Sequence, residues 1–400
     1  MLDLTKVAAQ VSIAVSQFRD GLAEHATRLK QAHTLVAKGD ADFEKLRHKI
    51  EASSKKTAWL IADPAEPLGT RYPTPNIPPN YTVIATDGSN IDVDRHQSAR
   101  CCLINIGQAR LDYGDDYNAE LTSVPRLYAD KSEMSLSNGL HEQAIEGTLL
   151  GIKRTVEELE HLAKVSAKVP PEKPTLALVD GSLIMWGLTN EGYPDFVSHE
   201  LLENGYLKAM NKLYDLAKRS RIVLASYISF PRSANAVNSL RLVLCPEAIA
   251  DCGKHCKGLT NKERPCESMS GVQDSDIFNE LLAIGERSAI FRSQSKITER
   301  YGPHRVYFFY LKLAEEIARI EIPEWVALDK DRLNLTHALI NDQCQRGDGY
   351  PVALAEAHEQ AVITGADRAN FQQVWESWLI SERLPQATSA KSQSKRTRWV

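Results

Sequence analysis

Two stretches of the sequence decide the fold: TVIATDGSN at residues 82–90 and TLALVDGSL at residues 175–183. Each is a mostly apolar run that ends on Asp-Gly-Ser, at Asp87 and at Asp180. Strand interiors disfavour aspartate and Gly-Ser favours a turn, so each aspartate is predicted to lie at the C-terminal end of a β-strand. Because α/β sheets place their chemistry at that end, the two carboxylates are predicted to serve one site.

The residues around these two strands predict an α/β sheet with covering helices. Further strands are expected at 98–114 and 221–228, and amphipathic helices at 140–167 and 198–219. The resulting order β-β-α-β-α-β is typical of layered α/β folds. Later segments predict β-like structure at 305–313 and 317–327, a helix at 331–346, and within 347–363 a turn that enters another helix at Pro351.

Composition divides the chain into several parts. Residues 1–61 are predicted to form a helical extension, in which KGD at 38–40 separates two helices and apolar residues from Leu4 to Leu29 form a narrow seam. That seam either packs on its own domain or binds a partner or a second copy. Residues 62–80 carry six prolines and predict an extended linker. Residues 81–380 form the main domain, interrupted by a cysteine-containing insertion at 245–275, and the basic residues 381–400 predict a disordered tail.

Overall composition argues against several classes of protein. The 400 residues are 43% hydrophobic and 25% charged, with a net charge of −4, so no global basic field indicates nucleic-acid binding. No apolar run is long enough to cross a membrane, and the N-terminus lacks a signal-peptide pattern, which together predict a cytoplasmic protein. Seven cysteines, an odd number, do not indicate a disulfide framework.

Carboxylates at strand ends, joined by one from a helix, are the ligands that two-metal phosphoryl chemistry requires. Mg²⁺ and Mn²⁺ prefer such oxygen ligands. Asp87 and Asp180 are the obvious pair, and either Glu142 or Glu146, one turn apart on the predicted helix, could complete a triad. Glu133 lies just upstream as a further alternative.

The segment GYPVALAEAH at residues 349–358 adds two candidate residues. Tyr350 lies at a predicted turn and His358 lies two turns into the next helix, whose alanines and Leu354 would pack toward the sheet that carries the acids. A neutral imidazole there could ligate a metal, and a protonated one could assist a leaving group.

Taken together, these segments resemble the NurA nuclease family, whose members are partners of the HerA translocase. The resemblance covers residues 81 to 380 and rests on the two DGS segments, YISFPRS (227–233), ARIEIPEW (318–325) and GYPVALAEAH (349–358). It implies a ribonuclease H-like mixed sheet, a manganese-dependent two-metal site and a homodimer. It also implies a DNA nuclease of the 5′–3′ exonuclease and single-strand endonuclease type, acting with a HerA-type hexameric ATPase in DNA end processing for double-strand break repair.

Residue by residue, the family's metal site falls on Asp87, Asp180 and His358, with Tyr350 nearby. The family's helix glutamate falls on Glu142, with Glu146 as the fallback. Many members carry an arginine ahead of that glutamate, whereas this chain has SLSNGLHE at 135–142.

Two other classes of function compete with a nuclease. An actin-like ATPase also has paired acidic turns, but the two turns of this chain lack the glycine that such an ATPase has two places after the aspartate. The GxxxxGK[ST] loop of the unrelated P-loop class is also absent from the sequence. A catalytically inactive DNA-end scaffold is the third class, which the retained acids disfavour. Metal-dependent DNA cleavage measured against ATP hydrolysis separates the three.

The cysteines and arginines supply further candidate sites. Four thiols within the insertion could hold Zn²⁺ or an iron–sulfur cluster, although the spacing C-x6-C-x3-C-x9-C matches no standard zinc motif; they are Cys245, Cys252, Cys256 and Cys266. The alternative is ordinary reduced cysteines in a loop.

Arginines near aromatic residues suit contacts with DNA, and the candidates are Arg232, Arg241, Arg300 and Arg305.

Overall fold

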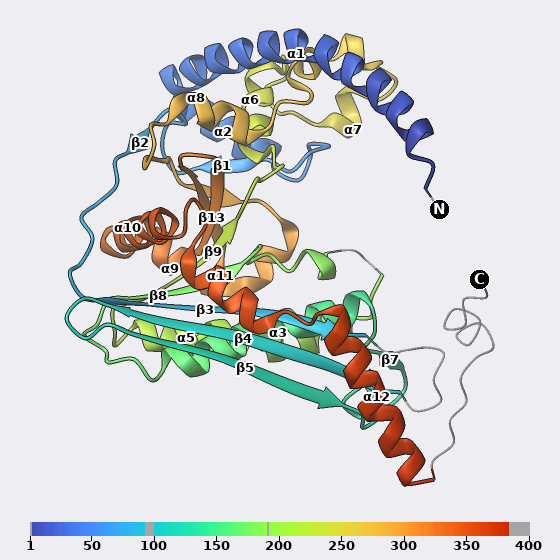
Figure 1. Cartoon of the computed structure of the whole chain (residues 1–400). Helices are drawn as coiled ribbons and strands as arrows, with labels where there is room; N and C mark the ends of the chain where they lie inside the picture. The colour runs from blue at the N-terminus through green and yellow to red at the C-terminus, as the bar shows by residue number, and fades with distance from the viewer. Residues whose placement is uncertain (1, 93–99, 190–191, 384–400) are drawn as a thin grey trace. The chain divides into compact units, whose positions relative to one another are not determined.

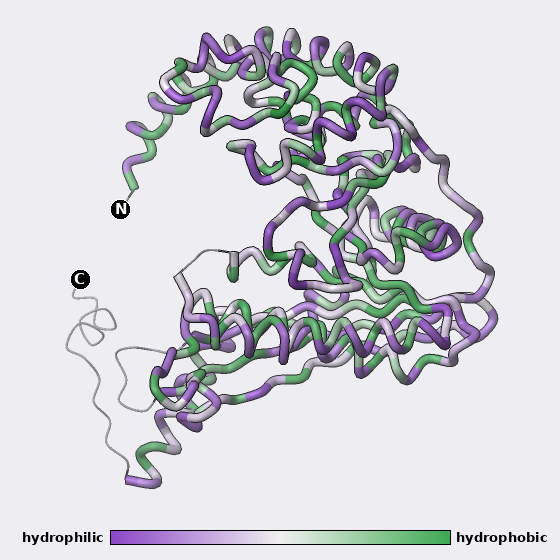
Figure 2. The backbone as a smooth tube through the Cα atoms, turned by 180° about the vertical axis from the view of Figure 1, so that it is seen from behind, coloured by the Kyte–Doolittle hydropathy of each residue, from purple (hydrophilic) through white to green (hydrophobic). Residues whose placement is uncertain are grey.

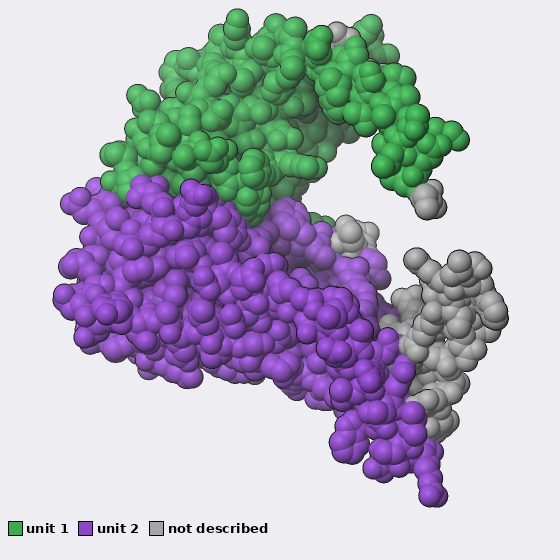
Figure 3. Space-filling view, in the orientation of Figure 1, with its two compact units in different colours: residues 1–74, 228–327 green, residues 75–227, 328–400 purple. Residues whose placement is uncertain are grey.

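The computed structural model describes residues 2–92, 100–189 and 192–383, which form two compact units (Figure 3). Unit 1 comprises residues 1–74 and 228–327, and unit 2 comprises residues 75–227 and 328–400. This division corrects the one predicted from composition, because the N-terminal helices fold together with residues 228–327 instead of forming a separate extension. The predicted tail at 381–400 lies almost entirely outside the described residues.

The core of unit 2 consists of five neighbouring strands of a mixed sheet (Figure 1). Its strands follow the spatial order β5 (Asn118–Tyr128), β4 (Cys102–Tyr113), β3 (Tyr81–Ile91), β8 (Thr175–Asp180) and β9 (Ile222–Ile228). β4 runs antiparallel to both of its neighbours, whereas β3, β8 and β9 are parallel. This order and these directions are those of a ribonuclease H-like sheet, so the predicted fold class is confirmed.

β3, β8 and β9 are almost continuously buried, because helices cover both faces of this sheet. On one face lie α3 (Thr148–Ser166) and α5 (Lys208–Ala217), and α11 (Val352–Ala361) lies across β3 and β4 on the other (Figure 1). The remaining helical segments of unit 2 are η1 (Trp186–Leu188), α4 (Asp195–Ser198), η2 (His199–Leu207), α10 (Lys330–Arg346) and α12 (Gly365–Ser381).

Two segments of unit 2 differ from the sequence-based prediction. The helix predicted over 140–167 begins only at Thr148, after Gly147 at φ 56°, and the residues before it form a hairpin of β6 (Ser135–Ser137) and β7 (Glu142–Ala144). Strand β5 was not predicted, because most of its side chains are exposed and Pro125 interrupts its β-pattern. Proline is tolerated there since β5 forms the edge of the unit 2 sheet.

Unit 1 has its own strands, and two of them come from the segment predicted to be an extended linker. β1 (Ala62–Pro64) pairs with β11 (Phe291–Ser293), and β2 (Arg71–Tyr72) pairs with β10 (Arg287–Ser288). β12 (Val306–Lys312) pairs with β11, β10 and β13 (Ile317–Pro323). Residues 62–72 therefore belong to the folded unit rather than to a free linker.

The N-terminal helices α1 (Leu4–Ala41) and α2 (Phe43–Ser53) complete unit 1, and their boundary lies at Asp42 rather than within 38–40. Leu35, Val36, Leu46 and Ile50 lie in the same hydrophobic core as Phe308. Along the first half of α1, in contrast, hydrophobic and hydrophilic residues alternate without being buried (Figure 2). The other helices of unit 1 are α6 (Asn235–Leu244), α7 (Cys252–His255), η3 (Asn261–Glu263), η4 (Pro265–Met269), α8 (Asp274–Leu281), η5 (Lys296–His304) and α9 (Glu324–Ala327).

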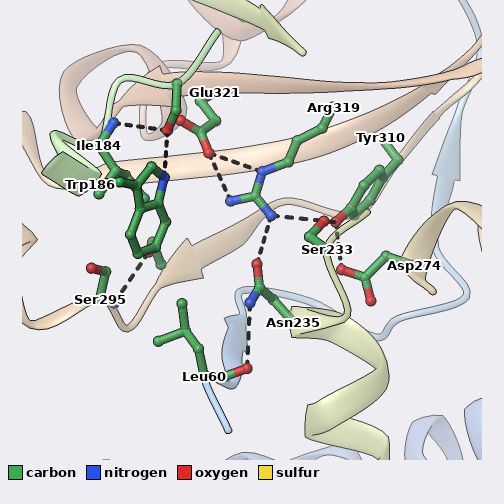
Figure 4. Close-up of polar contacts among 12 residues, drawn as sticks. Leu60, Ile184, Trp186, Ser233, Asn235, Asp274, Ser295, Tyr310, Arg319 and Glu321 are labelled. Atoms are coloured by element: carbon green, nitrogen blue, oxygen red, sulfur yellow. Dashed lines mark hydrogen bonds and ion pairs between the residues drawn. The ribbon is translucent and has the colours of Figure 1, made fainter. Parts of the chain in front are cut away.

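The segment ARIEIPEW, at residues 318–325, supplies a buried polar network in unit 1 (Figure 4). Arg319 donates to Glu321 through Nε at 2.9 Å and to Asn235 at 2.8 Å. Tyr310 donates to Asp274, and the Arg319 guanidinium lies 3.5 Å from the ring centroid of Phe308. A buried charge is tolerated only when it is paired in this way, which accounts for the polar residues within this apolar strand.

Among the described residues, no helix combines the length and the apolarity that crossing a membrane requires.

Candidate active site

Asp87 and Asp180 occupy equivalent positions on neighbouring parallel strands. Thr86 of β3 is in register with Val179 of β8, so the two aspartates follow at the same level of the sheet. Each carboxylate accepts a hydrogen bond from the amide of the glycine after it, at 2.8 Å for Asp87 and 2.9 Å for Asp180. The two acids are thus brought side by side, although β3 does not end at Asp87 but continues beside β4 to Ile91.

Tyr350, just before α11, and His358, within α11, approach the two aspartates. The Nδ1 atom of His358 lies 2.7 Å from Oδ2 of Asp87. Tyr350 hydrogen bonds to Asp180, and its ring packs edge-on against Tyr227 with centroids 5.4 Å apart. Each aspartate therefore contacts one of the two residues that the sequence indicated: His358 contacts Asp87, and Tyr350 contacts Asp180.

The electrostatics of the site show that its carboxylates repel one another. Desolvation raises the pKa of Asp180, and the charge of Asp87 raises it further. Desolvation, followed by the charges of Asp180 and Asp87, also raises the pKa of the Tyr350 phenol. Tyr350 therefore stays protonated at neutral pH and donates its hydrogen bond to Asp180.

A third carboxylate, Glu158 of α3, belongs to the same cluster and was not predicted from the sequence. Desolvation raises its pKa to about 7, with Arg154 opposing the rise and Asp87 and Asp180 adding to it. The Nε atom of Arg154 lies 3.1 Å from Oε1 of Glu158, one helical turn away. A mostly buried glutamate that feels both aspartates is a feature of functional sites rather than of solvated helix faces.

Gly88 explains how Glu158 comes so near to the aspartates. A Cβ atom at this position would lie 2.5 Å from Oε1 of Glu158 and 2.9 Å from Cγ of Arg154. Gly107, which is paired with Asp87, has a similar role on the opposite face, where a Cβ would lie 2.0 Å from the carbonyl oxygen of Ala357 in α11. Glycine on each face thus lets a helix that carries a site residue approach the sheet.

Signals for Glu158 were present in the sequence. Glu158 lies in phase with Leu162 and Val165, four and seven positions later, and both are buried. A glutamate in the apolar stripe of an amphipathic helix is unusual. Arg154, four residues earlier, also fits the arginine that the resemblance leads one to expect ahead of the helix glutamate.

The structure places Glu142 and Glu146 at a different site. Glu142 lies in β7, outside any helix, and its carboxylate is 3.3 Å from Nζ of Lys131. Both glutamates line a pocket of about 360 Å³ together with Arg100. The prediction that one of them lies on the helix that faces the aspartates was therefore wrong, because α3 begins only at Thr148. Glu133, the further alternative, pairs with Arg126.

Not all of the arginines predicted to contact DNA are accessible. Arg241 is buried at 8% exposure and lies over the ring of Trp59 at 4.9 Å, so it is a packing residue. Arg232, Arg300 and Arg305 are exposed, and their contact with DNA stays a prediction.

All seven cysteines are free thiols. Across residues 2–92, 100–189 and 192–383, no group of three or more His, Cys, Asp or Glu side chains is arranged to hold a metal ion. The four-cysteine insertion at 245–275 therefore has no assembled metal site, and neither does the acidic cluster.

The acidic cluster nevertheless fits a divalent cation in its chemistry. Each of the three carboxylates has a partner other than a metal: His358 for Asp87, Tyr350 for Asp180 and Arg154 for Glu158. Desolvation first, and then repulsion from neighbouring carboxylates, raises the pKa of Glu158 and of Asp180, and a cation among them would relieve that repulsion. Carboxylate oxygens are the ligands preferred by Mg²⁺ and Mn²⁺.

Comparison with known proteins gives a family and several distant structures. The NurA domain family matches residues 81–363. The NurA nuclease from Sulfolobus solfataricus is 11% identical, with a TM-score of 0.47 over 92% of this chain and 98% of that one. A NurA structure with manganese is also 11% identical, with a TM-score of 0.33 over 88% of this chain and 98% of that one. Comparison with curated proteins gives no match.

Proposed function

The chain belongs to the NurA family, and we propose that it is a hydrolytic, divalent-metal-dependent nuclease that cleaves DNA at the cluster of Asp87, Asp180 and Glu158. The observation that carries this proposal is the convergence of three carboxylates from β3, β8 and α3: Glu158 approaches Gly88 beside Asp87, and besides desolvation the charges of both aspartates raise its pKa. Such a cluster is unfavourable by itself and becomes favourable when it binds cations.

Asp87, Asp180 and Glu158 would hold the metal, with His358 as a further ligand. Two divalent ions supply a clamp on the attacking and leaving oxygens of a phosphodiester displacement. Asp87 and Asp180, on adjacent strands, are suited to hold ions at the edge of the sheet, and Glu158 reaches the same place because Gly88 has no side chain.

His358 and Tyr350 are suited to handle protons and to orient the ligands. The imidazole of His358, which meets Asp87 through Nδ1, can hold a proton for a leaving oxygen, and its side chain is 62% exposed. Tyr350 remains a phenol and fixes one oxygen of Asp180. Arg154 offsets the charge of Glu158 as long as the site lacks cations.

The test is cleavage of end-labelled DNA by the full chain with Mn²⁺, Mg²⁺ or a chelator, with and without ATP. We expect metal-dependent cleavage without ATP, a loss of about 100-fold or more in Asp87→Asn, and wild-type activity in the matched control Glu142→Gln. ATP hydrolysis without DNA cleavage would favour the actin-like alternative. No activity of either kind would favour the inactive scaffold.

The mode of cleavage and the partners belong to the same proposal. We infer 5′–3′ exonuclease and single-strand endonuclease activity in DNA end processing for double-strand break repair, together with a HerA-type hexameric ATPase. The resemblance supports these inferences, and cleavage of a long duplex with and without the ATPase tests them. A cytoplasmic location, inferred from the sequence, stays a prediction.

A homodimer is supported by the first half of α1. Its apolar side chains are largely exposed, with Leu4 at 70%, Phe18 at 74% and Leu22 at 65%. An apolar stripe of this kind marks an interaction surface. Phe18→Glu with Leu22→Glu should convert a dimer to a monomer in light scattering, whereas a dimer that survives both changes would place the interface elsewhere. These surface substitutions leave the core intact, whereas removing residues 1–60 would strip Leu35, Leu46 and Ile50 from it.

A second metal at the four cysteines is a separate part of the proposal. Burial raises the pKa of Cys256, and the nearby Cys252 and Cys245 raise it further. Burial likewise raises the pKa of Cys266, with contributions from Cys256 and Cys252, so all four thiols belong to one electrostatically coupled group. Thiolates favour zinc or iron, whereas the acidic site favours Mg²⁺ or Mn²⁺. Elemental analysis of anaerobically purified protein should find about one zinc or one iron–sulfur cluster per chain, and substoichiometric zinc and iron would contradict it.

A further inference from the structure

Trp186 is a large apolar side chain that stays exposed within a buried segment. Leu183, Ile184, Met185 and Leu188 are between 0% and 7% exposed, whereas Trp186 is 44% exposed. Burying an aromatic side chain of this size is strongly favourable, so its exposure in the middle of an apolar run has a cost. Such a residue is suited to a function that needs an accessible ring.

The indole is held in a defined orientation (Figure 4). Its Nε1 donates to Oγ of Ser182 at 3.1 Å, and the same hydroxyl accepts from the amide of Ile184 at 3.0 Å. One turn of 3₁₀-helix fixes the backbone, and Thr189 donates its hydroxyl to the carbonyl oxygen of Trp186 at 2.7 Å. The polar edge of the indole is thus occupied by Ser182, and a ring already fixed in place loses little side-chain entropy on binding.

The segment that carries this ring begins at the acidic cluster and lies within the same unit. Ser182 is two residues after Asp180, so their Cα atoms are at most ~7.6 Å apart. On the other side, Gly187 packs against α3, where a Cβ would lie 2.8 Å from Cδ1 of Ile152. The segment that carries Trp186 therefore spans from the end of β8 to the helix that supplies Glu158.

We propose that Trp186 stacks on a base of the DNA strand bound at this site. The inference rests on the proposed nuclease function, which brings a phosphodiester to Asp180. A nucleotide whose phosphate lies at the carboxylates has its base within reach of a neighbouring ring. Every base has an apolar face, so stacking holds the strand without selecting its sequence. It also adds affinity at a place where acidic side chains disfavour phosphate contacts.

The test measures binding of fluorescently labelled single-stranded DNA to the full chain, with Ca²⁺ in place of Mn²⁺ to slow cleavage. We expect Trp186→Ala to weaken binding about 10-fold and Trp186→Phe to restore most of it. Trp378→Ala is the matched control, since Trp378 is 64% exposed on α12, and it should bind as the wild type does. Thermal melting of each variant verifies that it is folded.

Abasic positions moved one by one along the DNA identify the stacked base. An abasic site at one position of the DNA should weaken binding to the wild type. The same site should leave binding to Trp186→Ala unchanged, because this variant has already lost the stacking contact. Equal affinities and equal abasic profiles for the wild type and Trp186→Ala would overturn the inference. Unchanged DNA affinity with impaired self-association or ATPase stimulation would assign Trp186 to a protein interface and would also overturn it.

The same experiments separate this inference from the proposed function. In one outcome, the wild type fails to cleave DNA with Mn²⁺, yet one abasic position weakens its binding to DNA and has no effect on binding to Trp186→Ala. The nuclease proposal then fails and base stacking stands. If cleavage depends on Mn²⁺ while Trp186→Ala binds normally, the nuclease proposal stands and base stacking fails.

Discussion

The two Asp-Gly-Ser segments, at residues 87–89 and 180–182, share a sequence but differ in what surrounds them. Gly88 lies inside a continuing strand and is closely approached by Glu158, whereas Gly181 has φ +81° and a Cβ atom added there would meet open space. Ser89 donates to the carbonyl oxygen of Ala361, which ties α11 to the sheet. Ser182 instead accepts from Ile184 and Trp186 in its own loop.

The difference shows that one tripeptide serves two separate requirements. In the first segment, glycine provides space for Glu158 and serine fixes the helix that carries His358. In the second, glycine provides a left-handed turn and serine orients an exposed aromatic ring. Only the aspartates are equivalent, since both occupy the same level of neighbouring strands.

The largest effect is expected at the glutamate that approaches the first segment. Glu158→Gln should reduce metal-dependent cleavage by more than about 100-fold, because it removes a charge from the acidic cluster, whereas the matched Glu142→Gln should have no effect. Single-turnover assays over a range of Mn²⁺ concentrations measure both. Normal cleavage in Glu158→Gln would contradict the assignment of Glu158 as the third carboxylate of the site, and a loss in Glu142→Gln would point to Glu142 instead.

Alanine substitutions at Gly88 and Gly181 should distinguish a glycine that is needed for space from a glycine that is needed for its backbone conformation. Gly88→Ala places a methyl group against Glu158 and Arg154 and should reduce cleavage about 10- to 100-fold with little loss of stability, since two side chains can move. Gly181→Ala should destabilise the protein by about 1 kcal/mol through its positive φ, with a smaller effect on cleavage. Denaturant unfolding and cleavage of both variants test this contrast, and the reverse pattern would contradict it.

Stability of the chelated, metal-free protein should depend on Glu158. Its pKa is raised from 4.5 to about 7 in the folded state, so between these values the folded protein holds a proton that the unfolded chain releases. Stability should therefore fall as pH rises through this window, by on the order of 3 kcal/mol from this group. Glu158→Gln should flatten the profile in urea unfolding. A profile with the same slope in the variant would show that Glu158 is not the group responsible.

The smallest effects are expected at the two serines. Ser89→Ala should cost about 1 kcal/mol of stability, because it leaves the Ala361 carbonyl with one hydrogen bond fewer. Ser182→Ala should cost less and should weaken DNA binding slightly by releasing the indole of Trp186. Urea unfolding and DNA titration of the two variants measure these differences, and identical behaviour would remove the distinction between the two segments.

The sequence predicted the buried parts of the fold better than the exposed parts. β8 was predicted at its observed bounds and β9 within one residue, because strands covered on both faces read as continuous apolar runs. The bounds of α10 were also predicted within one residue. β5 was missed because its exposed side chains lack that pattern. The N-terminal helices were predicted, but their packing with residues 228–327 depends on contacts distant in the sequence.

Asp87, Asp180, Tyr350 and His358 were predicted from local sequence signatures, the Asp-Gly-Ser segments and the entry to a helix, and the structure brings them together, while their catalytic roles stay predictions. Glu158 was not, because its role depends on a close approach through Gly88 from another element. Trp186 was overlooked because the apolar run around it predicts burial, and only its exposure distinguishes it from its neighbours.

Anomalous diffraction from crystals soaked in Mn²⁺ locates the bound metal most directly. We expect a manganese peak bonded to oxygens of Asp87, Asp180 and Glu158, with none at Glu142, and its loss in crystals of Asp180→Asn. A peak at the pocket of Glu142 and Glu146, or no peak at the acidic cluster in protein that cleaves DNA with Mn²⁺, would contradict the assignment of this cluster as the metal-dependent active site.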